Sequence, residues 1–209
     1  MAELIEDRVK ALRIAVGVMG SAGGNLSESA RRSAFDMGRA IAERGCVLVT
    51  GACPGLPHEA VKGAKSKAGV VVGISPALNF EEHCIKYHSP YEGYDLLVYT
   101  GSGLMGREVE NIRTCDLVVF MGGRSGTLGE FSIAYDEGKI IGVLQGTGGI
   151  ADRMEMIVEL IQKSTGSQVL YNRDPAILLD RLLGVYRERL LPYYKTVLAN
   201  SHPEGRLED

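Results

Sequence analysis

No run of apolar residues in this 209-residue sequence approaches the ~20 that a membrane-spanning helix needs. The amino-terminal stretch MAELIEDRVKALR also lacks the apolar core of a secretory signal peptide. The few cysteines show no C-x-x-C spacing, and the few histidines show no metal-ligand spacing. These residues are Cys46, Cys53, Cys84, Cys115, His58, His83, His88 and His202. We therefore expect a reduced, cytoplasmic protein without a membrane partner or a metal site.

An excess of charge of one sign is also missing. The 23 Lys and Arg residues against 26 Asp and Glu residues give a net charge of −3, and no block of like charge occurs. Nucleic-acid-binding proteins usually carry a basic patch or stripe, so we expect no nucleic-acid partner. Small anions must instead be attracted by local groups.

Apolar residues and glycine are abundant, and they are arranged in a regular order. Short runs rich in valine and isoleucine alternate with longer segments of helical period. This alternation predicts a doubly wound α/β fold, with a mainly parallel sheet and helices on both faces. Predicted strands are 13–19, 46–50, 69–74, 96–99, 117–121, 140–144 and a short one at 168–170; predicted helices are 27–43, 54–67, 104–114, 127–137, 150–163 and 174–190.

The length of the chain suits one well-buried domain better than two. We expect residues 1–191 to form a single nucleotide-binding domain. Residues 192–209, which begin at Pro192, are predicted to form a surface arm or a disordered tail.

Four predicted strands end in polar turns that contain glycine, at 20–24, 51–55, 101–103 and 122–126. The carboxyl ends of parallel strands lie at one edge of a sheet, and ligands of open α/β sheets bind in the crevice there. One such turn is an ordinary connection, but four at one edge favour a shared nucleotide-sized pocket. Gly20, Ser21 and Gly51 are expected to contribute to it.

The turn at 122–126 carries the most specific signal. It follows a buried strand and leads directly into a helix that Thr127 can cap. Free N–H groups at a helix start, together with the positive end of the helix dipole, favour a phosphate. The spacing is neither G-x-G-x-x-G nor a Walker A loop, so NAD and ATP are not the first expected ligands and no cofactor is predicted. The predicted phosphate-binding residues are Gly122, Gly123, Arg124, Ser125, Gly126 and Thr127.

Two side chains of the predicted helix 104–114 can face the same crevice. Arg107 lies near its start, and Asn111 lies one turn further along the same face. Arginine stays protonated in proteins, so it can grip a phosphate or stabilise charge on a departing group. The alternative is a surface ion pair, for example with Glu110.

Glu130 lies in the first turns of the helix whose start should bind phosphate. A carboxylate there would repel a phosphate, so we expect it to meet another part of the ligand, such as ribose hydroxyls or an attacking water. The alternative needs no ligand, because Thr127 and Glu130 match the capping box T-x-x-E.

The stretch from Arg107 to Glu130 resembles the LONELY GUY (LOG) proteins, whose older label is "possible lysine decarboxylase". Their signature is P-G-G-x-G-T-x-x-E, preceded by an arginine, and the resemblance extends over about residues 12–145. Gly122 stands where the family has proline, Arg124 where it has the second glycine, and Glu108 where a lysine often follows the arginine. Asn111-Ile112-Arg113 resembles the branch that includes a molybdenum-cofactor carrier protein.

The resemblance implies a Rossmann-like homodimer that binds a nucleoside 5′-monophosphate such as AMP. Active members hydrolyse its N-glycosidic bond to free base and ribose 5-phosphate. In that case Arg107 and Glu130 would be the catalytic residues, and Asn111 would join the nucleotide-binding set.

A second hypothesis is a non-catalytic carrier or sensor that holds a nucleotide-like ligand in the same pocket. Lysine decarboxylation is the weakest alternative, because its usual cofactor, pyridoxal phosphate, needs a Schiff-base lysine. No lysine lies between Gly101 and Gly138.

Overall fold

The computed structural model describes residues 13–201; residues 1–12 and the last part of the predicted tail, 202–209, lie outside the described residues. Its strands are β1 (Ala15–Gly20), β2 (Val47–Thr50), β3 (Val70–Ser75), β4 (Leu96–Tyr99), β5 (Leu117–Met121), β6 (Ile140–Leu144) and β7 (Gln168–Asn172). Its helices are α2 (Glu28–Glu43), α3 (Leu56–Lys65), α4 (Gly103–Thr114), α5 (Ser125–Asp136), α6 (Met154–Ile161) and α7 (Pro175–Ala199), with a short π-helix η1 (Glu82–Lys86) and a 3₁₀ turn η2 (Ala151–Arg153).

The seven strands form one sheet in the order β4-β3-β2-β1-β5-β6-β7, and every neighbouring pair is parallel. The chain builds outward from β1 to β4 and then returns to place β5 on the other side of β1. This reversal puts the topological switch point between the carboxyl ends of β1 and β5. The predicted doubly wound, parallel α/β fold is confirmed.

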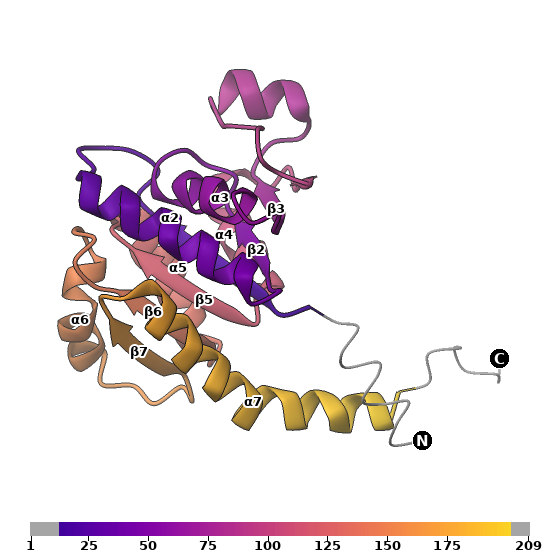
Figure 1. Cartoon of the computed structure of the whole chain (residues 1–209), viewed down its shortest axis with the longest axis vertical. Helices are drawn as coiled ribbons and strands as arrows, with labels where there is room; N and C mark the ends of the chain where they lie inside the picture. The colour runs from indigo at the N-terminus through magenta and orange to yellow at the C-terminus, as the bar shows by residue number, and fades with distance from the viewer. Residues whose placement is uncertain (1–12, 202–209) are drawn as a thin grey trace.

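Helices cover both faces of the sheet (Figure 1), and the central strand β5 shows why. Leu117, Val119 and Met121 pack on the side of α2, α3 and α7, whereas Val118 and Phe120 pack on the side of α4, α5 and α6. All five residues of β5 are buried. A strand buried on both faces must be apolar throughout, as its sequence LVVFM is.

The last helix departs from the prediction. It was expected to end at Leu190, before Pro192, but α7 continues through Pro192 to Ala199 and extends beyond the sheet (Figure 1). Proline removes one N–H group from a helix, which is tolerable where solvent reaches the freed carbonyl. The hydroxyl of Tyr194 donates a 2.8 Å hydrogen bond to Asp116, which ties the helix to the body beyond the proline.

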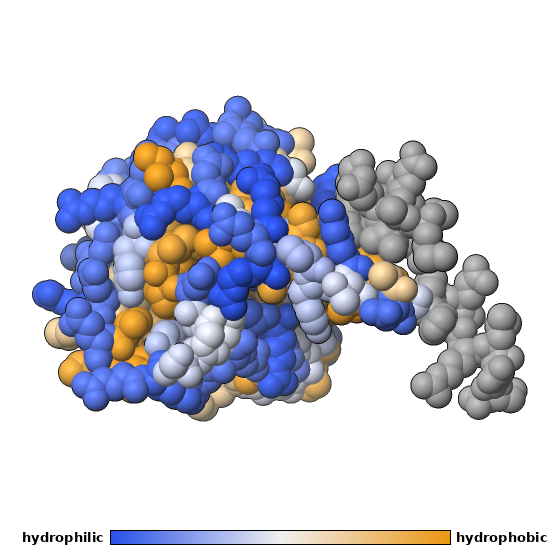
Figure 2. Space-filling model, turned by 90° about the horizontal axis from the view of Figure 1, so that it is seen from below, coloured by the Kyte–Doolittle hydropathy of each residue, from blue (hydrophilic) through white to orange (hydrophobic). Residues whose placement is uncertain are grey.

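None of the helices within residues 13–201 is long and apolar enough to cross a bilayer. On the face seen in Figure 2, hydrophilic residues predominate and apolar residues form patches between them.

Candidate functional site

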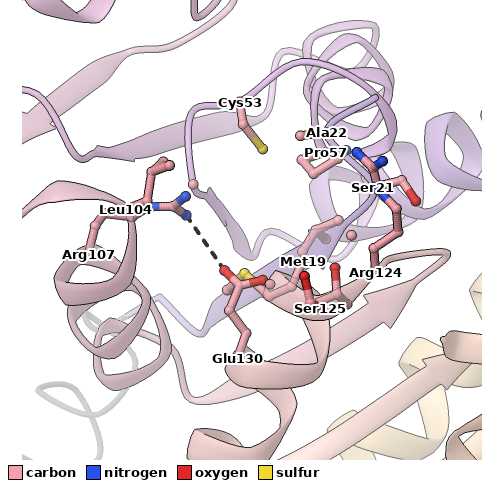
Figure 3. A pocket seen from close by; sticks show the side chains of 15 residues that line it. Met19, Ser21, Ala22, Cys53, Pro57, Leu104, Arg107, Arg124, Ser125 and Glu130 are labelled. Atoms are coloured by element: carbon pink, nitrogen blue, oxygen red, sulfur yellow. Dashed lines mark ion pairs between the residues drawn. The ribbon is translucent and has the colours of Figure 1, made fainter. Parts of the chain in front are cut away.

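A cavity of about 430 Å³ lies at the switch point, between the carboxyl ends of β1, β2 and β5 and the starts of α4 and α5 (Figure 3). Three of the four predicted glycine turns border it, together with the start of the helix that follows the turn at 101–103. Its walls are formed by Val18, Met19, Gly20, Ser21, Ala22, Gly51, Cys53, Pro57, Leu104, Arg107, Arg124, Ser125, Gly126, Thr127 and Glu130.

Arg107 from α4 and Glu130 from α5 meet in this cavity. Nη1 of Arg107 lies 3.6 Å from Oε1 of Glu130, and each side chain is only 9% exposed (Figure 3). Gly51 makes room for the guanidinium, because a Cβ built at residue 51 would overlap Arg107 Nη1. The alternative surface pair with Glu110 is absent, since the Glu110 carboxylate accepts a hydrogen bond from Ser102 instead. Arg107 and Glu130 therefore face the crevice, as expected.

Burial raises the pKa of the Glu130 carboxyl to about 7. The neighbouring Arg107 charge and the Asn111 amide act in the opposite direction, whereas the Glu108 carboxylate adds to the increase. Near neutral pH, Glu130 is thus divided between its acid and carboxylate forms. Such a perturbed carboxyl group in a cleft is characteristic of functional sites.

Asn111 is fully buried and does not line the cavity. Its Nδ2 atom lies 3.0 Å from the sulfur of Met19. Oδ1 of Asn111 and Nε of Arg107 are buried without a hydrogen-bond partner among the described residues. In this structure the Asn111 side chain therefore lies behind the cavity wall, against Met19, and its contact with a ligand stays a prediction.

Helix α5 begins at Ser125, earlier than predicted, so Thr127 is its third residue and cannot be the N-cap. The cap position is Arg124, which makes no side-chain capping bond, and the Thr127–Glu130 capping box does not form. The first N–H group of α5 with a backbone acceptor is that of Leu128, which bonds to the Arg124 carbonyl. In the described chain, the amides of Ser125, Gly126 and Thr127 have no hydrogen-bond partner. These three amides border the cavity and can accept an anion.

Two predicted phosphate donors are already occupied. The N–H of Gly122 donates to the Thr147 hydroxyl at 2.8 Å, and the N–H of Gly123 donates to the Ser21 hydroxyl at 2.6 Å. These two N–H groups are therefore not free in this structure, and phosphate contact at Gly122 and Gly123 stays a prediction. Both residues shape the turn, for which they adopt positive φ angles of 58° and 92°.

Gly20 also has a packing role. A Cβ at this position would overlap the carbonyl oxygen of Met121, so glycine allows the end of β1 to approach β5 closely. Ser21, the next residue, both lines the cavity and holds the turn after β5. These two turns are joined directly at the switch point.

Arg124 is exposed at the edge of the cavity and, within residues 13–201, forms no ion pair. In Figure 3 it lies with Ser21 at the opposite end from Arg107 and Leu104. Its guanidinium is open to solvent, and its contact with an anionic ligand stays a prediction.

Several wall residues were not singled out from the sequence. Met19 and Leu104 directly adjoin predicted glycine turns, and this proximity is the signal that could have identified them. Pro57 offers no comparable signal. Cys53 points its sulfur into the cavity, and burial raises its pKa to about 11. The thiol is therefore protonated at neutral pH and is a poor nucleophile.

The histidines do not form a metal centre in the described part of the chain, where no cluster of potential metal ligands occurs. His83 is fully buried. Its ring nitrogens lie 2.8 Å from the Ser75 hydroxyl and 3.0 Å from the Pro90 carbonyl oxygen. Both nitrogens are thus used to hold the connection between β3 and β4.

The fold and the site together define a Rossmann-like α/β protein with a polar crevice at the switch point of a parallel sheet. Comparison with known families gives a match of residues 13–179 to the model of the SLOG cluster4 family. The chain belongs to this family. The resemblance to LOG-like proteins found in the sequence is thereby confirmed.

Individual relatives are similar along most of the chain. An uncharacterized protein of Archaeoglobus fulgidus is 35% identical over 130 residues, which cover 62% of this chain and 79% of the relative. The structure of a molybdenum cofactor binding protein from Rippkaea orientalis has 26% identity and a TM-score of 0.69, with 83% and 98% of the two chains covered. The molybdenum cofactor carrier protein of Chlamydomonas reinhardtii has 26% identity and a TM-score of 0.65, with 82% and 99% covered.

Proposed function

We propose that the crevice binds a nucleoside 5′-monophosphate and that Arg107 and Glu130 hydrolyse its N-glycosidic bond. The observation that carries this proposal is the position of the buried Arg107–Glu130 pair. It faces the same cavity as the free amides of Ser125, Gly126 and Thr127. A phosphate on those amides would orient the rest of the nucleotide toward the pair.

The reaction breaks the bond between ribose C1′ and a nitrogen of the base, and the electron pair leaves with the base. The oxygen of a water molecule then bonds to C1′, and a proton from that water ends on the departed base. The Glu130 carboxylate would stabilise the positive charge that develops at C1′, while Arg107 would stabilise the leaving base. Because the pKa of Glu130 is about 7, the carboxylate form that this role requires predominates above neutral pH.

A second candidate is a carrier that holds a phosphate-bearing, nucleotide-like molecule without cleaving it. The names of two similar structures favour this function, since one is a molybdenum cofactor binding protein and the other a molybdenum cofactor carrier. The free amides and Arg124 would then hold the phosphate of the cargo. The Arg107–Glu130 pair would provide hydrogen bonds and no catalysis.

Incubation with AMP and GMP, followed by chromatography for free base and by thermal melting, tests these functions. Turnover that is lost in Glu130→Gln and Arg107→Ala supports the hydrolase. Glu137→Gln is the matched control, since Glu137 follows α5 outside the cavity and pairs with Arg113. Thermal stabilisation without turnover supports the carrier, because a ligand bound only to the folded state raises its stability. Neither turnover nor stabilisation with any nucleotide would contradict both.

A further inference from the structure

A second cavity, of about 500 Å³, adjoins the first at the same edge of the sheet. Three loops enclose it, and they follow β1, β5 and β6. Ser21 and Arg124 line both cavities, so the two spaces lie next to each other at these residues. Arg124 is exposed, so a ligand that reaches from one space to the other would pass along its side chain.

The walls of this second cavity expose backbone to an open space. A Cβ built at Gly23, Gly24, Gly146 or Gly148 would meet no atom within 4 Å. Positive φ angles account for three of these glycines, but Gly23 has no such conformation. Neither its backbone nor a protein neighbour requires glycine there, so the main chain at Gly23 is open to a group in the cavity. Within residues 13–201, the N–H groups of Gly23 and Gly24 have no hydrogen-bond partner.

The charges at the junction are of two kinds. Arg124 is the cation that both cavities share, and the Ser21 hydroxyl accepts from Gly123, which leaves its own proton for a ligand. Asp152 is the acidic group of the second cavity. Its carboxylate accepts hydrogen bonds from the amides of Gly146 at 2.6 Å and Gly148 at 3.0 Å. The remaining lone pairs of Asp152 suit hydroxyl donors and oppose a phosphate deep in this cavity.

We infer that the preferred ligand is longer than a nucleoside monophosphate: a nucleoside diphosphate joined to a hydroxylated group such as a sugar. The first phosphate lies on the amides of α5, the second lies beside Arg124 and Ser21, and the hydroxylated group fills the second cavity toward Asp152. This inference rests on the proposed nucleotide binding and extends it. It applies equally to a hydrolase and to a carrier.

Calorimetric titration of the full chain with two matched pairs of ligands tests the inference. AMP is compared with ADP-ribose, and GMP with GDP-mannose, because each pair differs only by the second phosphate and its sugar. We expect the longer member of the preferred pair to bind at least about tenfold more tightly, since the added groups make contacts without a second loss of translational freedom.

The variant Gly23→Val places a side chain in the second cavity and not in the first. It should remove the advantage of the longer ligand and leave the affinity for the monophosphate unchanged; its melting temperature without ligand shows that it folds. If the longer ligand binds no better than its monophosphate in the wild type, or if Gly23→Val weakens both equally, the inference is overturned while nucleotide binding stands. Absence of binding by all four compounds would overturn the proposed function and this inference together.

Discussion

Gly51 determines where the charged end of Arg107 can lie. The guanidinium occupies the space that a side chain at residue 51 would need, and from there it reaches Glu130. Gly51 was expected to contribute to the ligand pocket, and it lines the first cavity. It also makes room for the Arg107 side chain, in the same way that glycine elsewhere allows a ligand to approach closely.

Gly51→Ala should therefore reproduce the functional effect of Arg107→Ala. The added methyl group displaces the flexible end of Arg107, so the variant should fold normally and lose affinity for AMP, or turnover of AMP, by about tenfold or more. Calorimetry and the base-release assay measure these effects. Gly184→Ala in α7 serves as the remote control, because a Cβ there meets no atom within 4 Å. A folded Gly51→Ala protein with wild-type affinity and turnover would show that the position of Arg107 is unimportant.

The raised pKa of Glu130 also predicts a pH dependence of stability. Because the folded-state pKa of about 7 exceeds the ordinary glutamate pKa of 4.5, the stability associated with the protonated group is complete below about pH 4.5. It is lost as the pH rises toward and through 7, when a buried carboxylate must form. Glu130→Gln removes this loss. The difference in free energy of unfolding between this variant and the wild type should therefore change in favour of the variant by about 1–3 kcal/mol as the pH rises from 5 to 8.

Urea denaturation at several pH values measures this difference. Loss of the Arg107 contact in Glu130→Gln adds an offset at all pH values, so the change with pH is the informative quantity. Glu155→Gln removes a carboxylate from the exposed surface of α6 and is the control. A constant difference between Glu130→Gln and wild type over this range would show that Glu130 has an ordinary pKa.

At the scale of secondary-structure elements, α2 and α3 pack backbone against backbone. A Cβ at Gly38 of α2 would overlap the carbonyl of Ala60, and a Cβ at Gly63 of α3 would overlap the carbonyl of Phe35. Helix α3 follows the turn that contains Gly51 and Cys53, so this close contact also positions one wall of the site. Neither glycine was predicted to have this role.

Gly38→Ala should lower the free energy of unfolding by about 1–3 kcal/mol, because the packed helices must separate to admit the methyl group. Gly184→Ala is the same substitution in the interior of α7, where the space is open. It should raise stability by about 0.5–1 kcal/mol, since alanine favours the helical backbone. Urea denaturation of both variants compares them directly, and similar effects of the two would contradict the close packing of α2 on α3.

At the scale of the whole molecule, the resemblance to LOG proteins implies a homodimer. Apolar side chains are exposed where α4 begins: Leu104 is 56% exposed and Met105 is 81% exposed. Leu104 also lines the first cavity. An interface at this place would cover apolar surface close to the site, which favours association.

We predict that analytical ultracentrifugation gives a mass near twice 22.5 kDa. Met105→Lys should shift the protein toward the monomer, because a charged group would have to be buried in the interface. Met156→Lys changes another exposed methionine, on α6, and should leave the mass unaltered. A wild-type monomer at micromolar concentration, or equal behaviour of the two variants, would contradict this interface.

Local patterns in the sequence were sufficient to predict the strands, the parallel sheet and the general position of the site. The apolar run of β5 and the glycine turns after β1 and β5 depend only on residues close together in the sequence, so they can be recognised without a structure. The same local reasoning was wrong about the end of α7, because a hydrogen bond between Tyr194 and the distant Asp116 holds the helix beyond Pro192.

Only the tertiary structure decided which backbone amides are free. Gly122 and Gly123 resemble phosphate donors in the sequence, yet Thr147 and Ser21 occupy their N–H groups from other loops. The proximity of Gly51 to Arg107 and the second cavity beside Arg124 likewise depend on segments far apart along the chain. Periodicity and turn residues act over a few positions, whereas hydrogen-bond satisfaction and close packing depend on whatever the complete fold brings into contact.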